Sequence, residues 1–384
     1  MDFSFSEEQE AIRESARRFA AERLAPGYQA REAEGRIPRD LIAEMGELGL
    51  IGVDLDERFG GLGLSRLTCG IVAEEVARAD LSICYLVLNA SLLGSMISAH
   101  AGAEVAAEIL RPMCQGKSVL ALGLTEPRGG SDAAGLILKA RRDGERYILN
   151  GEKTSISLAN QADEIVVLAR TGEVEERARG VSAFVVAMDS PGVSVTTFND
   201  VGSRIVGRSS VFFDDVEVPI ERRMGEEGQG FRQIMNGFDY SRAIIGLQCL
   251  APAQASLDET WQYVTEREAF GVPIAKFQGV TEPLAEAATQ ISAARLLCYK
   301  TLWLRDQNLP HTSEAAMCKW WAPKLAFEVV HRCLLTHGHF GYSVDMPHQQ
   351  RMRDIMGLQI GDGTEQIMKM IIARERIGRI AVPY

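Results

Sequence analysis

At residues 122–132 the chain reads Leu122-Gly123-Leu124-Thr125-Glu126-Pro127-Arg128-Gly129-Gly130-Ser131-Asp132. This stretch joins an apolar strand to a loop that carries two adjacent glycines, a hydroxyl and a carboxylate. Such a loop brings backbone N–H groups close to an anionic or carbonyl-rich ligand. Taken alone, the same residues also describe a tight β-turn with an Asx cap. The stretch marks the point where a helical pattern gives way to β-rich runs.

The segments on either side of this stretch differ in period. Before it, the apolar residues of 12–24 recur at helical spacing after a plausible N-cap, Ser6, and Pro26 is expected to end that helix. After it, short β-rich runs separated by Gly and Asp/Asn turns continue to about residue 225, as in an antiparallel sandwich or barrel. From about Gly228 the helical period returns, and an apolar stripe runs from Leu284 to Leu302.

This order predicts an α+β fold with an N-terminal α-helical domain at 1–118, a middle antiparallel β-barrel or sandwich domain at 119–226, and a C-terminal domain resembling a four-helix bundle at 227–384. Neither a βαβ alternation nor a GxGxxG after a first strand is present, which argues against a Rossmann dinucleotide site.

The composition excludes several classes of protein. The chain has 384 residues, 46% of them apolar, and a net charge of -11, which disfavours nucleic acid or an anionic membrane surface as partner. Its seven cysteines form no CxxC pair, so we expect reduced, buried thiols. No stretch of 18 apolar residues and no targeting segment occurs, which predicts a cytoplasmic protein without membrane insertion.

A lone carboxylate lies between two glycines in Gln359-Ile360-Gly361-Asp362-Gly363-Thr364-Glu365-Gln366-Ile367. Without context, Asp362 followed by Glu365 is typical of a helix N-cap with its capping-box partner. The glycines, however, also allow the backbone to approach a ligand closely at this position.

Seven motifs, in order and along nearly the whole chain, resemble the FAD-dependent acyl-CoA dehydrogenases. Residues 122–132 are close to the family pattern L-T-E-P-x-A-G-S-D, with Gly129 in place of alanine. The stretch from Arg267 to Gln278 is the most specific match, because the family uses this arginine and glutamine on the FAD of a neighbouring subunit. The other motifs are 150–157, 213–219, 225–231, 238–242 and 353–364.

The resemblance implies a reaction and the residues that perform it. A thioester α-proton is weakly acidic, so its removal requires a carboxylate base, donors on the thioester oxygen and a hydride acceptor at Cβ. By resemblance, Asp362 is the base, its backbone N–H and the FAD ribityl hydroxyl form the oxyanion site, and flavin N5 accepts the hydride. Burial should raise the pKa of this carboxyl.

The residues that the resemblance assigns to FAD are Leu122, Leu124, Thr125, Gly130, Ser131, Ser155, Ser157, Arg267, Phe270, Gln278, Gly338, Thr364 and Gln366. Those assigned to acyl-CoA are Ser131, Phe238, Asp239, Arg242, Gly361, Asp362 and Gly363. No metal is expected, because His337 and His339 lack a third ligand at a recognisable spacing. The family implies a homotetramer, with electron-transfer flavoprotein as the electron acceptor.

Two departures from the family pattern bear on the substrate. Asp362 stands where the family normally has glutamate; the loss of a methylene withdraws the carboxylate by about 1.5 Å, and a displacement of about 1 Å can cost on the order of 100-fold in rate. We therefore hypothesise a branched or ring Cα, with cyclohexane-1-carboxyl-CoA as the best candidate. Ser155 replaces the usual tryptophan beside the flavin, and Ala269 and Leu335 replace polar residues that touch FAD.

Alternatives remain for the base and for the function. Some relatives carry the base at the position of Ser241, where a serine cannot serve, and Asp239 is a minor alternative. Within the same fold, the chain could be an acyl-CoA oxidase or an acyl-carrier-protein dehydrogenase. From another class, it could be a non-catalytic flavin-binding scaffold.

Overall fold

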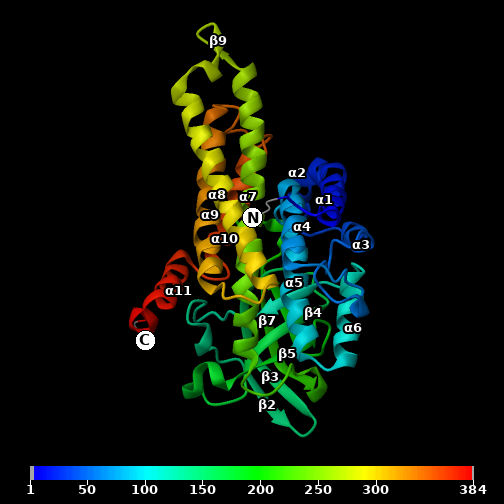
Figure 1. The fold of residues 1–384 in the computed structure, drawn as a ribbon. Helices are drawn as coiled ribbons and strands as arrows, with labels where there is room; N and C mark the ends of the chain where they lie inside the picture. Colours follow the sequence, from blue (N-terminus) through cyan, green and yellow to red (C-terminus); the bar gives the residue numbers. More distant parts are fainter. Residues whose placement is uncertain (1–3, 383–384) are drawn as a thin grey trace.

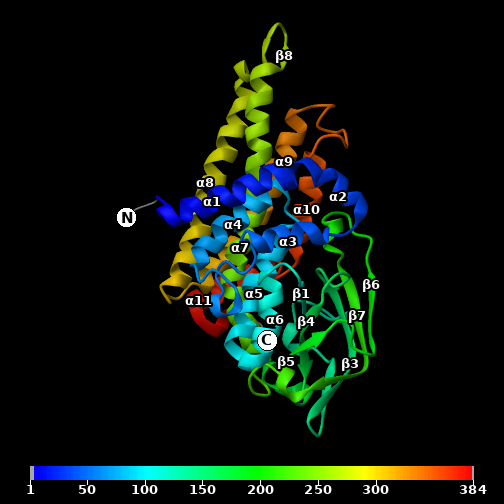
Figure 2. The ribbon, with the colours of Figure 1, turned by 90° about the vertical axis from the view of Figure 1, so that its right-hand side faces the viewer.

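A curled sheet packs against two groups of helices in this computed structural model, which describes residues 4–382. The outermost residues of the first and last predicted domains, 1–3 and 383–384, lie outside the described residues. The two helical groups pack on each other beside the sheet (Figure 1, Figure 2). The predicted α+β class is confirmed. None of the described helices is both long and apolar enough to span a membrane.

The N-terminal helices begin with the predicted N-cap. Ser6 Oγ accepts a hydrogen bond from Gln9 N at 3.2 Å, and Gln9 Oε1 accepts one from Ser6 N at 3.0 Å, a complete capping box. The helices of this group are α1 (Glu7–Phe19), α2 (Tyr28–Glu34), α3 (Arg39–Glu47), α4 (Arg66–Ala79), α5 (Cys84–His100) and α6 (Ala103–Cys114).

The prediction that Pro26 ends the first helix was wrong. After α1 the chain continues through a π-helical turn, Ala20–Leu24, and a 3₁₀ turn, Ala25–Gly27, into α2. Pro26 lies at the start of the 3₁₀ turn, where its missing N–H leaves no intrahelical hydrogen bond unmade. A proline can therefore mark a junction between helical segments without ending them.

The described residues form a seven-stranded sheet whose pairing is mixed. Its strands are β1 (Leu120–Gly123), β2 (Lys139–Asp143), β3 (Arg146–Ile156), β4 (Glu164–Arg170), β5 (Val181–Ala187), β6 (Val193–Thr197) and β7 (Ser209–Pro219). The pairs β2–β3, β3–β7, β4–β5 and β6–β7 are antiparallel, as expected. β1 and β2 instead pair in parallel with β4. The β2–β3 hairpin lies between β1 and β4 in the chain, so β4 can return alongside β1 in the same direction.

The C-terminal helices form a bundle whose core includes the predicted apolar stripe. They are α7 (Gly230–Glu266), α8 (Gln278–Asp306), α9 (Thr312–Thr336), α10 (His348–Ile360) and α11 (Glu365–Ile377). On α8, Leu284, Ile291 and Cys298 are fully buried. The short hairpin of β8 (Glu268–Ala269) and β9 (Val272–Pro273) connects α7 to α8 at the far tip of the bundle (Figure 1). All seven cysteines are buried free thiols, as expected.

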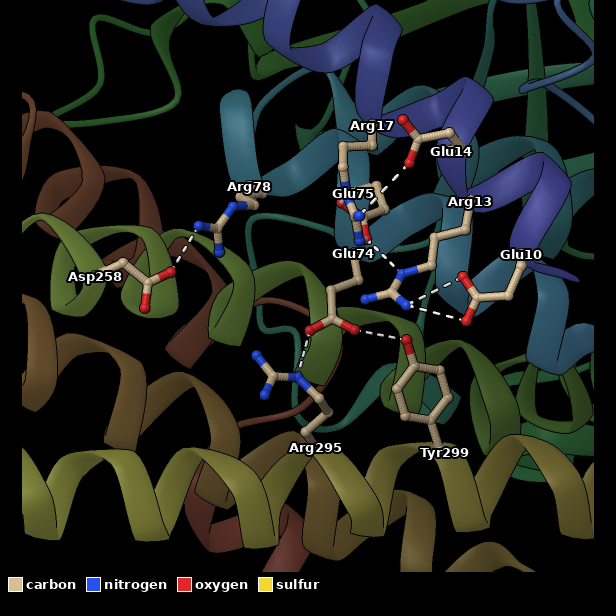
Figure 3. Close-up of polar contacts among 10 residues, drawn as sticks. All are labelled: Glu10, Arg13, Glu14, Arg17, Glu74, Glu75, Arg78, Asp258, Arg295 and Tyr299. Carbon is tan, nitrogen blue, oxygen red and sulfur yellow. Dashed lines mark hydrogen bonds and ion pairs between the residues drawn. The ribbon is translucent and has the colours of Figure 1, made fainter. Parts of the chain in front are cut away.

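An ion-pair network joins the two helical groups through α4 (Figure 3). The buried Glu75 accepts from Arg13 Nε at 2.9 Å and from Arg17 Nη2 at 2.8 Å, both on α1. Its neighbour Glu74 accepts from Arg295 Nε of α8 at 2.5 Å. The adjoining contacts are Glu74 with Tyr299 and Arg78 with Asp258. A buried carboxylate is stable only when it is paired, so these ion pairs are costly to break. Because Glu75 binds α1 and Glu74 binds α8, α4 holds α1 in place relative to the bundle.

His348 at the start of α10 should make the fold sensitive to acid. Its side chain is fully buried beside the His337 ring, 4.5 Å away between centroids, and neither ring nitrogen has a hydrogen-bond partner. Burial lowers the pKa of His348 from 6.5 to about 4, with His337 and Arg351 contributing and Glu259 opposing. Between pH 6.5 and pH 4, His348 is therefore protonated in the unfolded chain but neutral in the folded chain. The free energy of unfolding falls as the pH drops from about 6.5 to 4.

The expected loss attributable to His348 is about 3 kcal/mol of unfolding free energy. Urea titrations of the protein and of His348→Leu at pH 7 and pH 4.5 measure it. The substitution should flatten the pH dependence, whereas an equal fall in both proteins would assign the acid sensitivity to other groups.

Candidate active site

A cavity of about 410 Å³ lies between the sheet and the helices, and five segments distant in sequence line it. Tyr85 and Leu88 come from α5, Phe238 and Arg242 from α7, and Asp362 from the connection between α10 and α11. The loop after β1 and the end of β3 complete the wall. The predicted site residues that line this cavity are Leu122, Leu124, Thr125, Gly130, Ser131, Ser155, Ser157, Phe238, Arg242, Gly361, Asp362, Gly363 and Thr364.

Asp362 does not cap the helix that follows it. Thr364 is the N-cap of α11, its side chain accepting from Ile367 N, so the N-cap reading of Asp362 was wrong. Asp362 adopts a left-handed conformation with φ of 55°, which is uncommon for a residue with a side chain and concentrates at functional sites. Gly363 follows at φ of 109°, where an added Cβ would meet Met368 Cε at 2.3 Å. This backbone leaves the Asp362 carboxylate in the cavity wall.

Burial raises the pKa of the Asp362 carboxyl, and the positive charges of Lys319 and Arg242 act against that rise. Arg242 Nε also donates to Asp362 O at 3.4 Å. From α5, the Tyr85 ring borders the same cavity, and burial followed by the Asp362 charge raises the pKa of its phenol. A carboxyl with a raised pKa inside a largely apolar cavity has the properties of a general base.

Lys319 is a residue of this site that sequence reasoning missed. It lies on α9, is 1% exposed, and donates from Nζ to Leu358 O at 2.7 Å and to Gly363 O at 3.1 Å. Burial lowers the pKa of the Lys319 ammonium to about 8, while the Asp362 charge acts in the opposite direction. In the sequence, Lys319 is an ordinary polar residue of a helical run ahead of two tryptophans.

The 122–132 loop is anchored by a buried ion pair between Lys153 and Glu126. Lys153 Nζ donates to Glu126 Oε1 at 2.8 Å and to Leu124 O at 3.1 Å. The same carboxylate accepts from Ile137 N and Leu138 N, both at 2.8 Å. Burial lowers the pKa of the Lys153 ammonium to about 8, while the negative charge of Glu126 acts to raise it. Both residues belong to motifs visible in the sequence, but only the fold reveals that they are partners.

Ser155 is presented to the cavity by an irregular end of β3. Its φ is 61°, and its hydroxyl accepts from Arg208 Nη1 at 3.0 Å. Arg208 is in turn paired with Asp200 and lies over the Phe198 ring, 4.7 Å from its centroid. The position where the family pattern has an indole therefore holds a small hydroxyl beside a fixed guanidinium.

A second cavity of about 980 Å³ adjoins the first, and Ser131, Phe231 and Arg242 line both. Asp239 lies in this second cavity and not in the first. Its Oδ2 accepts from Thr312 Oγ1 at 2.7 Å, and its Oδ1 lies 3.5 Å from Arg242 Nη1. Basic side chains on its wall are Arg177, Arg232 and Arg374.

Five predicted FAD residues do not line the Asp362 cavity of their own chain. Arg267, Phe270 and Gln278 lie at the tip between α7 and α8, and the Phe270 side chain is 95% exposed. Gly338 follows the end of α9 with φ of 62°, and Gln366 is exposed on α11. The tip residues stand far along the bundle from the sheet (Figure 1).

Three family models match successive parts of the chain. They are described as the acyl-CoA dehydrogenase N-terminal domain, matching residues 6–117, the middle domain, matching 121–216, and the C-terminal domain, matching 228–377. Together they account for most of the sequence.

Individual relatives agree over nearly their whole length. A probable acyl-CoA dehydrogenase, YngJ, of Bacillus subtilis is 34% identical over 98% of this chain and 99% of its own. The caffeyl-CoA reductase-Etf complex subunit CarC of Acetobacterium woodii is 35% identical over 96% and 98%. The structure of butyryl-CoA dehydrogenase from Megasphaera elsdenii superposes with a TM-score of 0.94 at 31% identity, covering 98% of this chain and 100% of that one.

These matches agree with a cavity that is lined both by Asp362 and by a glycine- and hydroxyl-containing loop. The chain therefore belongs to the acyl-CoA dehydrogenase family and is an oxidoreductase that uses FAD to dehydrogenate acyl-CoA.

Proposed function

We propose that this protein introduces a Cα=Cβ double bond into a short or alicyclic acyl-CoA, with cyclohexane-1-carboxyl-CoA as the best candidate and Asp362 as the α-proton base. The single observation that carries the proposal is the Asp362 carboxyl, which lines an otherwise largely apolar cavity with its pKa raised by burial. With a thioester bound, less water reaches the carboxylate, and its basicity toward the α-proton increases.

The cavity fits the flavin end of FAD by the chemistry of its donors. Hydroxyls of Thr125 and Ser157 lie on the wall together with the apolar side chains of Leu122 and Leu124, which suits a flat ring with polar edges. When bound, FAD supplies the hydride acceptor for Cβ.

The outlying residues are proposed to hold the rest of FAD. Thr364 and Gln366, at the start of α11, would reach the adenosine part. Arg267 and Gln278 would hold the pyrophosphate of a neighbouring subunit's FAD, with Phe270 and Gly338 beside it, which explains why they lie away from the cavity of their own chain. This arrangement requires an oligomer, and we propose a homotetramer.

The protein's own donors would stabilise the charge that develops on the thioester oxygen. We assign this role to the Asp362 backbone N–H, together with the FAD ribityl hydroxyl, because donors fixed before the reaction need no reorganisation during it. Arg242 contacts the next peptide unit, because its Nε donates to Asp362 O.

The second cavity is proposed to hold the CoA chain. It adjoins the first through Ser131. Phe238 lines the first cavity, where the acyl group would lie, and Asp239 and Arg242 line the second, where the pantetheine chain would pass. Its wall carries three arginines, Arg177, Arg232 and Arg374, that are suited to the CoA phosphates. One guanidinium group can donate two parallel hydrogen bonds to two oxygens of a phosphate.

The short carboxylate is the reason for proposing a ring at Cα. A cyclic Cα is bulkier and is held differently from a linear one, so it can meet a base that is withdrawn by about one methylene. We expect purified protein to turn over cyclohexane-1-carboxyl-CoA with a higher kcat/KM than butyryl-CoA, by about 10-fold or more. Preference for butyryl-CoA would remove the alicyclic proposal and leave the family activity intact.

The variant Asp362→Glu provides the matched comparison. The added methylene should raise kcat/KM for butyryl-CoA and lower it for the cyclic ester. A uniform loss on both substrates would show that carboxylate length does not select the acyl group.

For the electron acceptor we propose electron-transfer flavoprotein, and for the location the cytoplasm. The relative CarC is named as a subunit of a complex with Etf, which supports this choice. Ser155 leaves the flavin edge less covered than an indole would, so hydrogen peroxide formation in air is the assay that would instead favour an oxidase. Turnover of acyl groups only on a carrier protein would favour the carrier-protein dehydrogenase.

A further inference from the structure

The segment that carries Asp362 is clamped by one buried ammonium group. Lys319 Nζ donates to Leu358 O, in the last turn of α10, and to Gly363 O, one residue beyond Asp362. The two acceptors bracket the glycine and the aspartate of the connection. One side chain from α9 therefore ties the last turn of α10 to the connection that carries Asp362.

These carbonyls need a strong donor. The last carbonyls of a helix lack an intrahelical partner and carry the negative end of the helix dipole, and burial prevents water from satisfying them. Leu358 O is such a carbonyl, and the Lys319 ammonium satisfies it together with Gly363 O of the connection and adds a favourable charge interaction. Lys319 is 1% exposed, so this contact is made away from bulk water.

The clamp also restrains an unfavourable backbone. Asp362 is held at φ of 55°, a conformation that persists only where the surrounding structure enforces it. Gly363 next to it is at φ of 109°. Without the clamp, the segment is free to relax toward an ordinary conformation, which would move the carboxylate.

The charge of Lys319 acts on Asp362 as well. The groups that act electrostatically on the Asp362 carboxyl are Lys319 of α9 and Arg242 of α7, with the phenol of Tyr85 on α5 sensing its charge. The groups around Lys319 are Asp362, Arg242 and the Cys249 thiol of α7. Lys319 is thus one of two cations whose charge opposes the burial-driven rise in the pKa of the Asp362 carboxyl.

We infer that Lys319 is a positioning residue for the base, fixing the segment around Asp362 by its two main-chain contacts and placing a positive charge next to that segment. The inference rests on the proposed role of Asp362. It assigns to α9, which does not border the Asp362 cavity, control over the place and the electrostatic surroundings of the reacting group.

Three substitutions separate the two effects. Lys319→Met removes the charge and the donors, Lys319→Gln keeps a donor without charge, and Lys319→Arg keeps both. Lys324→Met is the matched control, since Lys324 lies on the same helix but is exposed. The readout is the pH profile of kcat/KM with the best acyl-CoA, because the position of its acid limb does not depend on how much of the enzyme is folded.

In Lys319→Met the acid limb should move up by about one pH unit, since a neighbouring cation shifts a carboxyl pKa by one unit or more, and kcat should fall by about 100-fold. Lys319→Gln should move the limb equally but lose less kcat. Lys319→Arg should keep the limb in place, and Lys324→Met should match the unmodified protein.

An unmoved limb in both Lys319→Met and Lys319→Gln, with bound flavin at normal levels, would overturn the inference. Asp362→Asn is assayed alongside to distinguish the two levels of the argument. If Asp362→Asn retains full turnover, the proposed function fails. If it is inactive while the Lys319 variants keep the normal limb, only the clamp fails.

Discussion

Replacement of Asp362 by asparagine is expected to lower kcat by about 10³-fold while FAD remains bound. A positioned general base contributes roughly 10²- to 10⁴-fold to a rate, and asparagine cannot accept the α-proton. Asparagine also tolerates the left-handed backbone of this position, so the segment should keep its shape. The measurement is steady-state turnover with an artificial electron acceptor, together with the flavin absorbance of the purified variant.

The comparison variant is Asp239→Asn, which changes the other carboxylate near the site. Asp239 lies in the second cavity and is held by Thr312 and Arg242, so its replacement should affect KM for acyl-CoA more than kcat. If Asp239→Asn abolished turnover and Asp362→Asn did not, the role of base would pass to Asp239.

Replacement of Glu126 by alanine is expected to lower the unfolding free energy by about 3–5 kcal/mol. The substitution leaves the Lys153 ammonium buried without its counter-charge, and it removes the acceptor of two backbone N–H groups. The 122–132 loop loses its anchor, so flavin should also be bound more weakly. Urea titration monitored by circular dichroism, with flavin retention on gel filtration, measures both effects.

Lys153→Met is the matched variant for this pair. It removes the ammonium but leaves the Glu126 carboxylate with its two backbone donors, so the loss of stability should be smaller than for Glu126→Ala. Losses below about 1 kcal/mol for both variants would show that the pair is not the anchor of the loop.

Local sequence signals were sufficient for much of the fold. The N-cap at Ser6, the stripe on α8 and the order of helices and strands all depend on residues near one another in the chain, and each was confirmed. The prediction from Pro26 failed because the rule that a proline ends a helix considers only the helix before it. Here the chain continues through a 3₁₀ turn into a second helix. The parallel pairing of β1 with β4 depends on a return across the sheet that no local pattern encodes.

The motifs predicted which loops meet, but not what holds them together. Residues from the loop after β1, the end of β3, α7 and the Asp362 segment line one cavity. The contacts beneath it, Lys319 with Gly363 and Lys153 with Glu126, join residues 44 and 27 positions apart, and a buried lysine resembles an exposed one in sequence. The limits of the three domains and the roles of the individual site residues remain predictions.

The role of Asp362 is measured by rapid anaerobic mixing of the FAD-loaded protein with cyclohexane-1-carboxyl-CoA, with loss of the flavin's yellow absorbance as the signal. The flavin of the unmodified protein should bleach fast, and that of Asp362→Asn should hardly bleach at all. Bleaching of the variant at the unmodified rate would contradict the assignment of the base. Failure of cyclic, branched and linear thioesters alike to bleach the unmodified protein would indicate a flavin-binding scaffold without this activity.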